Sequence, residues 1–436
     1  MTAVKVGLLG LGTVGAGTIN LLERNNDEIA RRAGRGINVV AAAARNLDRP
    51  RGCSTQGIRL TTDPFEVVND PETEIVVELM GGYEPARELV IRALKNGKHV
   101  VTANKALIAL HGNEIFAHAR DNGVTVAFEA AVAGGIPIIK SIREGLAGNR
   151  IEWLAGIING TANFILSEMY YEGRQFADVL AEAQRLGYAE ADPTFDVEGV
   201  DAAHKLTILA SIAFGIPLQY DKVHVEGISH ISREDVAYAE ELGYRIKHLG
   251  ICRQTDEGIE LRVHPTLLPQ RQLLASVDGV MNAVMVMGDA VGPTLYYGAG
   301  AGADATASAV VADLVDVVRE FELDPVNRVP YLAFQSTALS DAPVLPVSAI
   351  VTAYYLRMEV LDQPGVLADI TRILGEAGIS IEAILQKEPA PGAEDVPVIL
   401  LTHPVRERQM DEAQERMEAL EAVQGRITRI RQEQLQ

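Results

Sequence analysis

The sequence predicts an α/β protein in three parts: an open parallel sheet, an α+β part with a mixed sheet, and a ferredoxin-like unit. Three observations predict this organisation. A glycine-rich turn between an apolar run and an amphipathic run opens the chain, the apolar pattern changes at Ile151, and a proline-rich stretch precedes a final β-α-β-β-α-β pattern. The expected parts are 1–135, completed by about 300–322, then 136–300, a linker at 323–350, and 351–436.

The composition excludes several classes of protein. The chain has 436 residues, 47% of them hydrophobic, and a formal net charge of -20. This length supports about two to four domains with real cores, and the acidic balance argues against nucleic acid or an anionic membrane surface as a partner. Cys53 and Cys252 are too few for a disulfide framework and lack metal-type spacing. With neither a signal peptide nor a membrane-length apolar run in the sequence, we expect a cytoplasmic protein.

The opening stretch, VKVGLLGLGTVGAG at 4–17, has the G-x-G-x-x-G spacing between a predicted strand and a predicted helix. Gly10 allows the tight turn, Gly12 lets the backbone approach a pyrophosphate, and Gly15 lets the helix pack closely on the strand. The first amides of the helix then face the phosphates. This context favours a Rossmann-type dinucleotide-binding unit over an ordinary βα turn. The expected contacts are Gly10, Leu11, Gly12, Thr13, Val14 and Gly15.

The second predicted strand, at 36–46, ends in Ala43, Ala44 and Arg45. Units that prefer NAD usually place Asp or Glu here to hold the ribose 2′-hydroxyl, whereas an arginine can pair with a 2′-phosphate. Arg45 therefore favours NADP, with a solvated loop arginine as the alternative and NAD left open.

A later strand, at 99–101, is followed by Thr102, Asn104 and Lys105. Ligands bind outside the carboxyl ends of the strands in open parallel sheets. Lys105 is therefore expected where cofactor and substrate meet, although a surface lysine at a helix start has the same spacing. Beyond it, the Gly-Gly-Ile-Pro turn after Glu129 exposes carbonyls that either coordinate a cation or connect two domains.

The second part carries an acidic loop ahead of a helix expected at about 197–214. The acidic residues of this loop are Glu190, Asp192 and Asp196. Asp201 and Lys205 are four apart and share one face of the helix. Such pairs are usually solvated, but the helix beyond Lys205 is strongly apolar and therefore buried. Because buried charges need partners, the pair and the acidic loop indicate a ligand site.

Glycines return further along the chain. Strands are expected at 260–268 and 281–289, and Gly298, Gly300 and Gly302 precede a helix expected at about 306–318. A glycine-rich helix start can face the cofactor a second time, which would return the chain to its first part.

The last part reads as a ferredoxin-like unit. Its expected elements are a strand at 353–362, a helix at 363–379 ended by Gly378, strands at 380–388 and 396–404, a helix at about 406–422, and a strand from Arg426. Units of this kind commonly bind small ligands or pair edge to edge.

Together these stretches resemble the monofunctional bacterial homoserine dehydrogenases with a C-terminal ACT domain. The motifs are GLLGLGTVG at 7–15, VTANKALIA at 101–109, FEAAVAGGIPII at 128–139, NGTANFIL at 159–166 and GYAEADPTFDVEGVDAAHKL at 187–206. The resemblance covers essentially the whole chain, and its last two motifs are the most specific. No aspartate kinase segment precedes the fingerprint, so we expect the form without a fused kinase. Ala305 stands where proline is expected.

The resemblance implies interconversion of L-homoserine and L-aspartate 4-semialdehyde with NADP or NAD, in threonine, methionine and isoleucine biosynthesis. It implies that Lys205, Lys105 and Asp201 form the catalytic group. Lys205 is then the general acid that protonates the developing alkoxide, and Lys105 lies near the reacting oxygen and the nicotinamide, although the motif leaves open which lysine transfers the proton. The implied substrate-binding residues are Glu190, Asp196, Asp201, Gly160, Thr161 and Lys105, and Gly302 joins Arg45 and Lys105 at the cofactor.

The resemblance also implies further ligands and partners. A sodium ion is expected on the backbone carbonyls of Glu129, Val132, Gly134 and Ile136, in a structural more than a chemical role. Threonine is the expected effector of the ACT domain. Residues 136–300 are the expected catalytic and dimerisation domain of a homodimer or homotetramer.

Three alternative functions fit the sequence less well. An aspartate-semialdehyde dehydrogenase needs a nucleophilic cysteine with a histidine partner, and neither Cys53 in a loop nor Cys252 in a strand suits that role. A hydroxyacid dehydrogenase with an ACT domain would carry its fingerprint in mid-chain. A non-catalytic sensor would bind a dinucleotide and an amino acid without turnover, which the retention of both lysines and the acidic residues disfavours.

Overall fold

A computed structural model describes residues 2–387 and 395–435, and its contacts divide the chain into two compact units. The first unit consists of Met1–Gly160, Asp201–Val223 and Val280–Ala342. The second consists of Thr161–Val200, His224–Gly279 and Pro343–Gln436. The two units are described separately below.

The first unit is built on a six-stranded parallel sheet with the order β3-β2-β1-β4-β5-β6. This is the Rossmann-type order, which confirms the predicted fold. Strands of such sheets are buried on both faces and are therefore apolar throughout, and Val4, Val6 and Leu8 have no exposed surface. The strands are β1 (Val4–Leu9), β2 (Ile37–Ala43), β3 (Arg59–Thr61), β4 (Ile75–Glu78), β5 (His99–Thr102) and β6 (Val126–Ala127).

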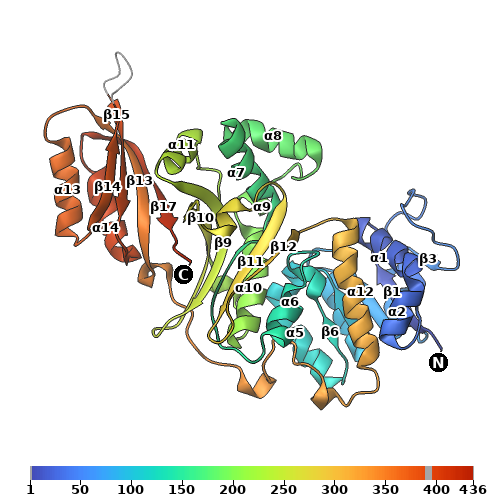
Figure 1. Ribbon diagram of the computed structural model, residues 1–436. Helices are drawn as coiled ribbons and strands as arrows, with labels where there is room; N and C mark the ends of the chain where they lie inside the picture. Colours follow the sequence, from blue (N-terminus) through green and yellow to red (C-terminus); the bar gives the residue numbers. More distant parts are fainter. Residues whose placement is uncertain (1, 388–394, 436) are drawn as a thin grey trace. The chain divides into compact units, whose positions relative to one another are not determined.

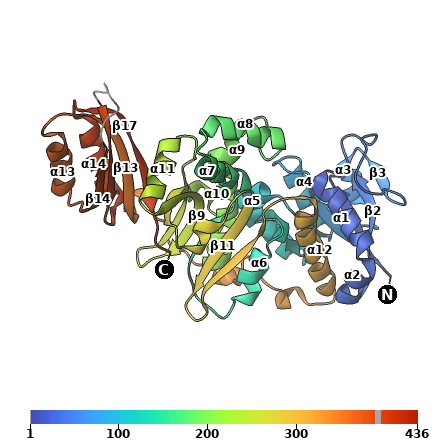
Figure 2. The same cartoon turned by 45° about the horizontal axis from the view of Figure 1, so that its top comes forward.

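Helices cover both faces of this sheet. One group is α1 (Thr13–Arg24), α2 (Asn26–Ala33) and α12 (Ala303–Arg319), and the other is α3 (Pro64–Asn69), α4 (Ala86–Lys95) and α5 (Lys105–Asp121). Figures 1 and 2 show α12 beside α1, although the two are far apart in the sequence. The approach is close because Gly17 has no side chain: a Cβ there would lie 2.7 Å from the carbonyl oxygen of Ala303.

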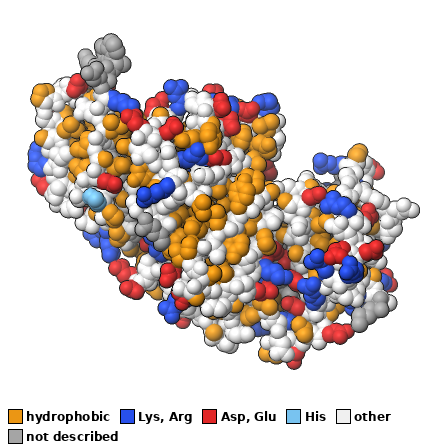
Figure 3. All heavy atoms as spheres, viewed as in Figure 1, with side chains coloured by type: hydrophobic (Ala, Val, Ile, Leu, Met, Phe, Trp, Pro, Cys, Tyr) orange, Lys and Arg blue, Asp and Glu red, His pale blue; other side chains and the backbone are white. Residues whose placement is uncertain are grey.

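The rest of the first unit carries the second set of elements. These are α6 (Ile138–Lys140), a π-helical turn (Ser141–Gly145), β7 (Ile151–Ile157), α10 (Val200–Phe214), β11 (Met281–Gly288) and β12 (Gly292–Ala299). Strand β11 pairs antiparallel with both β7 and β12. Hydrophobic side chains gather over β11 and β12 in Figure 3. Val291, directly before β12, and Tyr297, in β12, are 50% and 58% exposed. Strand β12 was not expected from the sequence.

The helix expected at 197–214 is interrupted. A short helix, α9 (Thr194–Val197), comes first, and α10 begins only at Val200. The break falls at Gly199, whose φ of +83° is a left-handed conformation that favours glycine. The expectation that Asp196 lies in a loop is therefore wrong, because Asp196 lies in α9. The expected burial of α10 is confirmed, since every residue from Asp201 to Phe214 is buried.

The second unit begins with helices that pack on a small sheet. The helices are α7 (Gly160–Glu172), α8 (Phe176–Leu186), α9 and α11 (Arg233–Glu241), and the strands are β8 (His224–Val225), β9 (Tyr244–Gln254) and β10 (Ile259–Pro269). Strand β10 pairs antiparallel with β9 and parallel with β8. Short 3-10 segments in the chain lie at Glu129–Ala131, Tyr220–Lys222, Leu273–Ser276, Pro325–Asn327, Ser336–Ala338 and Val347–Ala349.

The C-terminal part of the second unit has the predicted β-α-β-β-α-β order. Its elements are β13 (Val351–Leu361), α13 (Val366–Glu376), β14 (Ile381–Gln386), β15 (Asp395–Thr402), β16 (Val405–Arg406), α14 (Glu407–Glu418) and β17 (Val423–Gln432). The strand order β17-β13-β15-β14 is ferredoxin-like. Gly378, with φ of +73°, follows α13 as expected, whereas Glu388, the expected end of one strand, lies outside the described residues.

This C-terminal part does not stand apart from the rest of the second unit. The end of β17 pairs parallel with β10, with Arg431 opposite Thr266 and Gln432 opposite Leu267. One hydrophobic cluster also runs from α7 and β9 to Tyr355. The sequence pattern predicts a self-contained unit at 351–436 but does not predict the sheet and the hydrophobic core that this unit shares with the rest of the second unit.

Candidate active site

The glycine fingerprint has the geometry that its spacing predicts. Gly10 has φ of +108°, and a Cβ on Gly15 would lie 2.3 Å from the carbonyl oxygen of Gly10. Gly12 has open space around it, with no atom within 4 Å of where its Cβ would be. Leu11 is buried in the core, and Thr13 begins α1 in an exposed position. The turn is thus tight on its inner side and open where a pyrophosphate would approach.

Two lysines from different helices share one carboxylate. The Nζ of Lys205 donates to Oδ2 of Asp201 at 2.6 Å and to the carbonyl oxygen of Ile158 at 2.7 Å. The Nζ of Lys105 lies 2.9 Å from Oδ1 of the same aspartate. Asn159 donates from Nδ2 to Oδ2 of Asp201 at 2.9 Å. The i, i+4 pair of the sequence is therefore a buried group that also contacts Ile158, Lys105 and Asn159, not a solvated pair.

The electrostatics of this group follow from its burial. Burial by itself raises the pKa of Asp201, but the charges and hydrogen bonds of Lys205 and Lys105 outweigh it and hold that pKa well below its usual range. His204, next to Lys205 on α10, is 1% exposed and stacks on Tyr220. Burial lowers the pKa of His204 to about 4, so its ring is neutral near pH 7. His204 was not predicted as a site residue; a histidine inside an apolar helix was the available signal.

Both lysines face one cavity of about 300 Å³ in the first unit. The cavity lies at the carboxyl ends of β4 and β5, and its lining includes Val14 from the fingerprint, Lys105, Gly134, Lys205 and Gly300. Gly302, the residue before α12, has φ of +127° and directly follows Gly300 and Ala301, which line the cavity. This is the edge of the sheet at which the sequence predicts that ligands bind.

A polar scaffold fixes Lys105 at its strand end. Thr102 donates from Oγ1 to the fully buried carboxylate of Glu78 at 2.7 Å and accepts from the backbone N–H of Asn104 at 3.0 Å. Asn104 caps α5 by accepting from the N–H of Leu107 at 3.1 Å. Burial raises the pKa of Glu78. Glu78 was not predicted as a site residue; a glutamate at the end of an apolar strand was the available signal.

The predicted cation loop is strained and buried. Ala133 and Gly134 have φ of +55° and +50°, and a Cβ on Gly134 would lie 2.5 Å from the carbonyl oxygen of Gly300. The carboxylate of Glu129 accepts from the N–H groups of Ile139 and Lys140 at 2.9 and 2.8 Å, so its side chain caps the following helix. The carbonyls of Glu129 and Ile136 each accept one intrachain hydrogen bond. A carbonyl oxygen has a second lone pair, so both fit a cation ligand.

No metal cluster of side chains competes with this loop. Within residues 2–387 and 395–435, no group of three or more His, Cys, Asp or Glu side chains is arranged to hold a metal ion. In the same residues, no helix is both long and apolar enough to cross a membrane.

Arg45 lies where the sequence predicts. It follows β2, whose last residue, Ala43, accepts a hydrogen bond from the N–H of Gly10 at 3.0 Å. Its side chain is exposed. No acidic residue stands at the end of β2, where a carboxylate would hold a ribose 2′-hydroxyl.

The other predicted substrate residues lie around the start of α7 and in the second unit. Gly160 begins α7, and a Cβ there would lie 2.8 Å from the carbonyl oxygen of Val280. Within the second unit, Thr161 donates from Oγ1 to the carbonyl oxygen of Tyr188 at 2.6 Å, which ties α7 to the acidic loop. Glu190 is exposed on that loop, and Asp196 is half-buried in α9.

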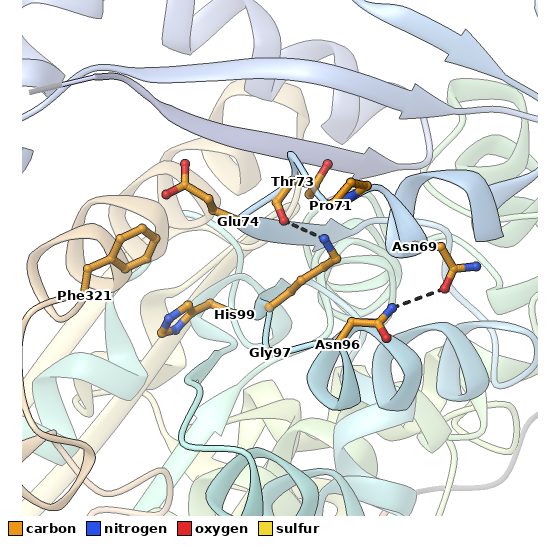
Figure 4. Close-up of a pocket in the computed structure, with 9 residues that line it drawn as sticks. Asn69, Pro71, Thr73, Glu74, Asn96, Gly97, His99 and Phe321 are labelled. Atoms are coloured by element: carbon orange, nitrogen blue, oxygen red, sulfur yellow. Dashed lines mark hydrogen bonds between the residues drawn. The ribbon is translucent and has the colours of Figure 1, made fainter.

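A second cavity, of about 580 Å³, lies at the amino ends of β4 and β5 (Figure 4). Lys98 donates there to the carbonyl oxygens of Asp70 and Thr73, and Asn96 donates to Oδ1 of Asn69 at 3.2 Å. The side chains of Lys98 and Asn96 are thus bonded to neighbouring protein groups, and the cavity contains no residue that the sequence predicted for the site.

Neither cysteine is placed to act as a nucleophile. Cys252 is buried in β9, and Cys53 is half-buried in a loop where burial raises the pKa of its thiol. Both positions disfavour the thiolate that a nucleophilic cysteine needs.

A dinucleotide-binding edge and a lysine–carboxylate group in one cavity are the parts that hydride transfer at a CH–OH carbon requires. The fold and this cavity therefore define an NAD(P)-dependent oxidoreductase, to which a ferredoxin-like unit is attached.

Comparisons with known proteins identify the family. Residues 10–129 match the profile "Homoserine dehydrogenase, NAD binding domain", 137–315 match "Homoserine dehydrogenase", and 354–422 match "ACT domain". The chain is 66% identical over 435 residues to a homoserine dehydrogenase of Pseudomonas aeruginosa, with 100% of both chains covered. A homoserine dehydrogenase structure from Thiobacillus denitrificans matches with a TM-score of 0.95 and 65% identity, covering 100% of this chain and 99% of that one.

A more distant structure, a hyperthermophilic archaeal homoserine dehydrogenase in complex with NADPH, matches with a TM-score of 0.62 and 26% identity over 73% of this chain and 99% of that one. The chain belongs to the homoserine dehydrogenase family. It interconverts L-homoserine and L-aspartate 4-semialdehyde with a nicotinamide dinucleotide, and its ACT domain is of the kind that regulates enzymes allosterically.

Proposed function

We propose that Lys205 transfers the proton in this reaction and that Lys105 orients the reacting oxygen. The observation that carries the proposal is the shared carboxylate. Both ammonium groups lie within 3 Å of Asp201, and both lysines line the same cavity as Val14 of the glycine fingerprint. Lys205 has two fixed acceptors, Ile158 and Asp201, which hold its ammonium group in one position. Lys105 is 35% exposed and more adaptable, which suits a binding role.

The chemistry of each residue follows from its charge. The bound dinucleotide supplies or accepts the hydride. During reduction of the semialdehyde, the ammonium of Lys205 gives one proton to the oxygen that becomes the alcohol, and the neutral amine remains beside Asp201. During oxidation of homoserine, that amine takes the proton back. Asp201 stays ionised throughout, so it stabilises the ammonium form and orients both lysines.

Chemical rescue of a site that lacks Lys205 tests this assignment. Lys205→Ala should lower turnover of homoserine with NADP by about 10²- to 10⁴-fold, and added methylammonium should restore part of it because it replaces the proton donor. Binding of NADP should be unchanged. The matched control is Lys222→Ala, an exposed lysine of the same unit, which should keep full activity. Rescue of Lys105→Ala in place of Lys205→Ala would reverse the two roles.

The proposal extends to the substrate ends. Glu190, Asp196, Gly160 and Thr161 bind the amino and carboxyl groups of homoserine, together with Asp201 and Lys105. Support comes from the family motifs at 159–166 and 187–206 and from the hydrogen bond that ties Thr161 to the acidic loop. Glu190→Gln should raise the KM for homoserine without changing the KM for NADP.

We also propose NADP as the preferred cofactor. Support comes from Arg45 beyond β2 and from the alanines that stand where an acidic residue would favour NAD. The archaeal relative was solved with NADPH. NAD remains the alternative, and the ratio of kcat/KM for the two cofactors decides between them.

A sodium ion on the carbonyls of Glu129, Val132, Gly134 and Ile136 completes the proposed site. Support comes from the strained turn at Ala133 and Gly134 and from the use of the Glu129 side chain elsewhere. The ion would fix the loop that lines the cavity, so replacing sodium with choline should lower the melting temperature more than it changes KM.

The regulation and assembly are proposed in the same way. Threonine is the proposed effector, supported by the ACT domain match at 354–422, and an assay with L- and D-threonine tests it. A homodimer or homotetramer is supported by the exposed side chains of Val291 and Tyr297 along an edge of sheet. Two cysteines without disulfide spacing support a cytoplasmic location.

A further inference from the structure

One buried arginine of the ACT domain connects two carboxylates from different parts of the second unit. Arg431, near the end of β17, is 2% exposed. Its Nη1 and Nη2 donate to the two carboxylate oxygens of Glu226 at 2.8 and 2.9 Å. Its Nε donates to Glu407, the first residue of α14, at 2.9 Å. A bidentate pair of this kind fixes the position of the carboxylate as well as its charge.

Glu226 is itself fixed along its backbone. It directly follows β8, its N–H donates to the carbonyl oxygen of Val263 at 2.8 Å, and its own carbonyl oxygen accepts from Nε2 of His248 at 2.9 Å. Burial by itself raises the pKa of the Glu226 carboxyl, but His224 and Arg431 lower it well below the usual range, so the carboxylate is ionised at any working pH. Both members of the pair are therefore charged at neutral pH.

The next two residues support the helical turn that carries Asp196. The N–H of Ile228 donates to the carbonyl oxygen of Val197 at 2.8 Å. Gly227 lies so close to this turn that a Cβ would be 2.3 Å from Oε2 of Glu198 and 2.6 Å from the carbonyl oxygen of Val197. The segment Glu226–Ile228 thus forms the seat of α9, and only a residue without a side chain fits at its centre.

The other side of the same turn is equally tight. A Cβ on Gly199 would lie 3.0 Å from Cγ1 of Val225 and 3.1 Å from Cε1 of His248. Because α9 is held from both sides by β8 and its extension, a shift of Glu226 changes the position of α9.

We infer that Arg431 is a positioning residue for substrate binding: through Glu226 and the seat at 226–228, the last strand of the ACT domain holds α9 and with it Asp196. The inference rests on the proposed role of Asp196 in binding homoserine. It connects the C-terminal strand to Asp196 through neighbours in the sequence and hydrogen bonds, all within the second unit.

The test compares two buried ion pairs of the same ACT domain. Arg431→Met removes the pair with Glu226, and Arg431→Lys restores one charged contact. The matched control is Arg357→Met, because Arg357 is 17% exposed on its side chain and pairs with the fully buried Asp235 of α11, without touching residues 226–228. Folding of each variant is checked by its melting curve, and the KM values for homoserine and for NADP are measured separately.

We expect Arg431→Met to raise the KM for homoserine about ten-fold, with little change in the KM for NADP, and Arg431→Lys to lie between it and the wild type. Arg357→Met should lower the melting temperature without changing either KM. A folded Arg431→Met protein with a wild-type KM for homoserine would overturn the inference, as would an equal rise in Arg357→Met.

Two further variants separate the possible failures. If Arg431→Met does not fold, Glu226→Gln, which leaves Arg431 paired with Glu407, should produce the same rise in KM, and a folded Glu226→Gln protein with a wild-type KM would refute the path. Asp196→Asn tests the underlying role. If it leaves the KM for homoserine unchanged, the proposed function of Asp196 fails. If it raises the KM while the Arg431 variants do not, only the positioning inference fails.

Discussion

Replacing Asp201 by asparagine removes the charge that holds two lysines together. The Asp201 side chain is 4% exposed and that of Lys205 is 11% exposed, so this pair is buried, whereas Lys105 at 35% is screened by solvent. Removing one member of a buried pair costs about 3–5 kcal/mol. Because Lys105 can turn to water, we expect the lower end, about 3 kcal/mol. At about 2–4 °C per kcal/mol for a domain of 150–250 residues, the melting temperature should fall by about 6–12 °C.

Activity should fall as well, because an asparagine presents a single acceptor oxygen to two ammonium groups. We expect kcat for homoserine oxidation to drop by about 10²-fold, measured by the absorbance of the reduced nicotinamide. Asp316→Asn is the control: its pair with Lys140 is partly exposed, so the free energy of unfolding should change by no more than a surface pair contributes, about 1 kcal/mol. Equal melting temperatures and equal kcat for Asp201→Asn and the wild type would refute the reasoning.

The same aspartate predicts a pH dependence. Its folded-state pKa is depressed, so its contribution to stability is fully present above the ordinary aspartate pKa of 3.8 and is lost as the pH falls further. The difference in melting temperature between wild type and Asp201→Asn should therefore be constant from neutral pH down to about pH 5 and should shrink only below about pH 4. A difference that shrinks already near neutral pH would contradict this.

Three shorter predictions concern other residues. His204 has a pKa lowered from 6.5 to about 4, so the wild type should lose stability as the pH falls through that window, and His204→Gln should lose less between pH 7 and pH 5 in thermal melts. Gly15→Ala should destabilise by about 1–3 kcal/mol because its Cβ meets the Gly10 carbonyl, whereas Gly52→Ala, in open space, should melt like the wild type. Arg45→Ala should raise the KM for NADP about ten-fold and leave the KM for NAD nearly unchanged; an equal effect on both would remove Arg45 from the 2′-phosphate.

Much of the fold was readable because its signals are local. The strand–glycine–helix pattern at 4–17 predicts the turn whose φ and close contacts the structure contains, and the period of the C-terminal part predicts the ferredoxin-like order. The errors were also local. The apolar spacing predicts one helix where Gly199 separates α9 from α10, and the glycines at 298–302 were interpreted without recognising β12 before them.

The candidate site was less accessible from the residues alone. The spacing of Asp201 and Lys205 is equally typical of a solvated pair, and it was the apolar helix beyond Lys205, the acidic loop and the family motifs that favoured a buried site. The neighbours of this pair are distant in sequence: Lys105 begins α5, and Ile158 directly follows β7. The spacing of Glu78 and His204 in the sequence does not mark them as site residues. Their importance comes from their burial, which the tertiary structure determines.

The sequence by itself determined the elements, the glycine turn that admits a dinucleotide, and the residue types of the reaction, because these depend on neighbours within a few positions. The tertiary structure alone decided that Lys105 and Lys205 share one carboxylate, that α12 packs on α1, and that β17 continues beside β10 with Arg431 on Glu226. The physical reason is that hydrogen-bond periodicity is encoded along the chain, whereas the pairing of distant buried charges depends on which faces the packed core brings together.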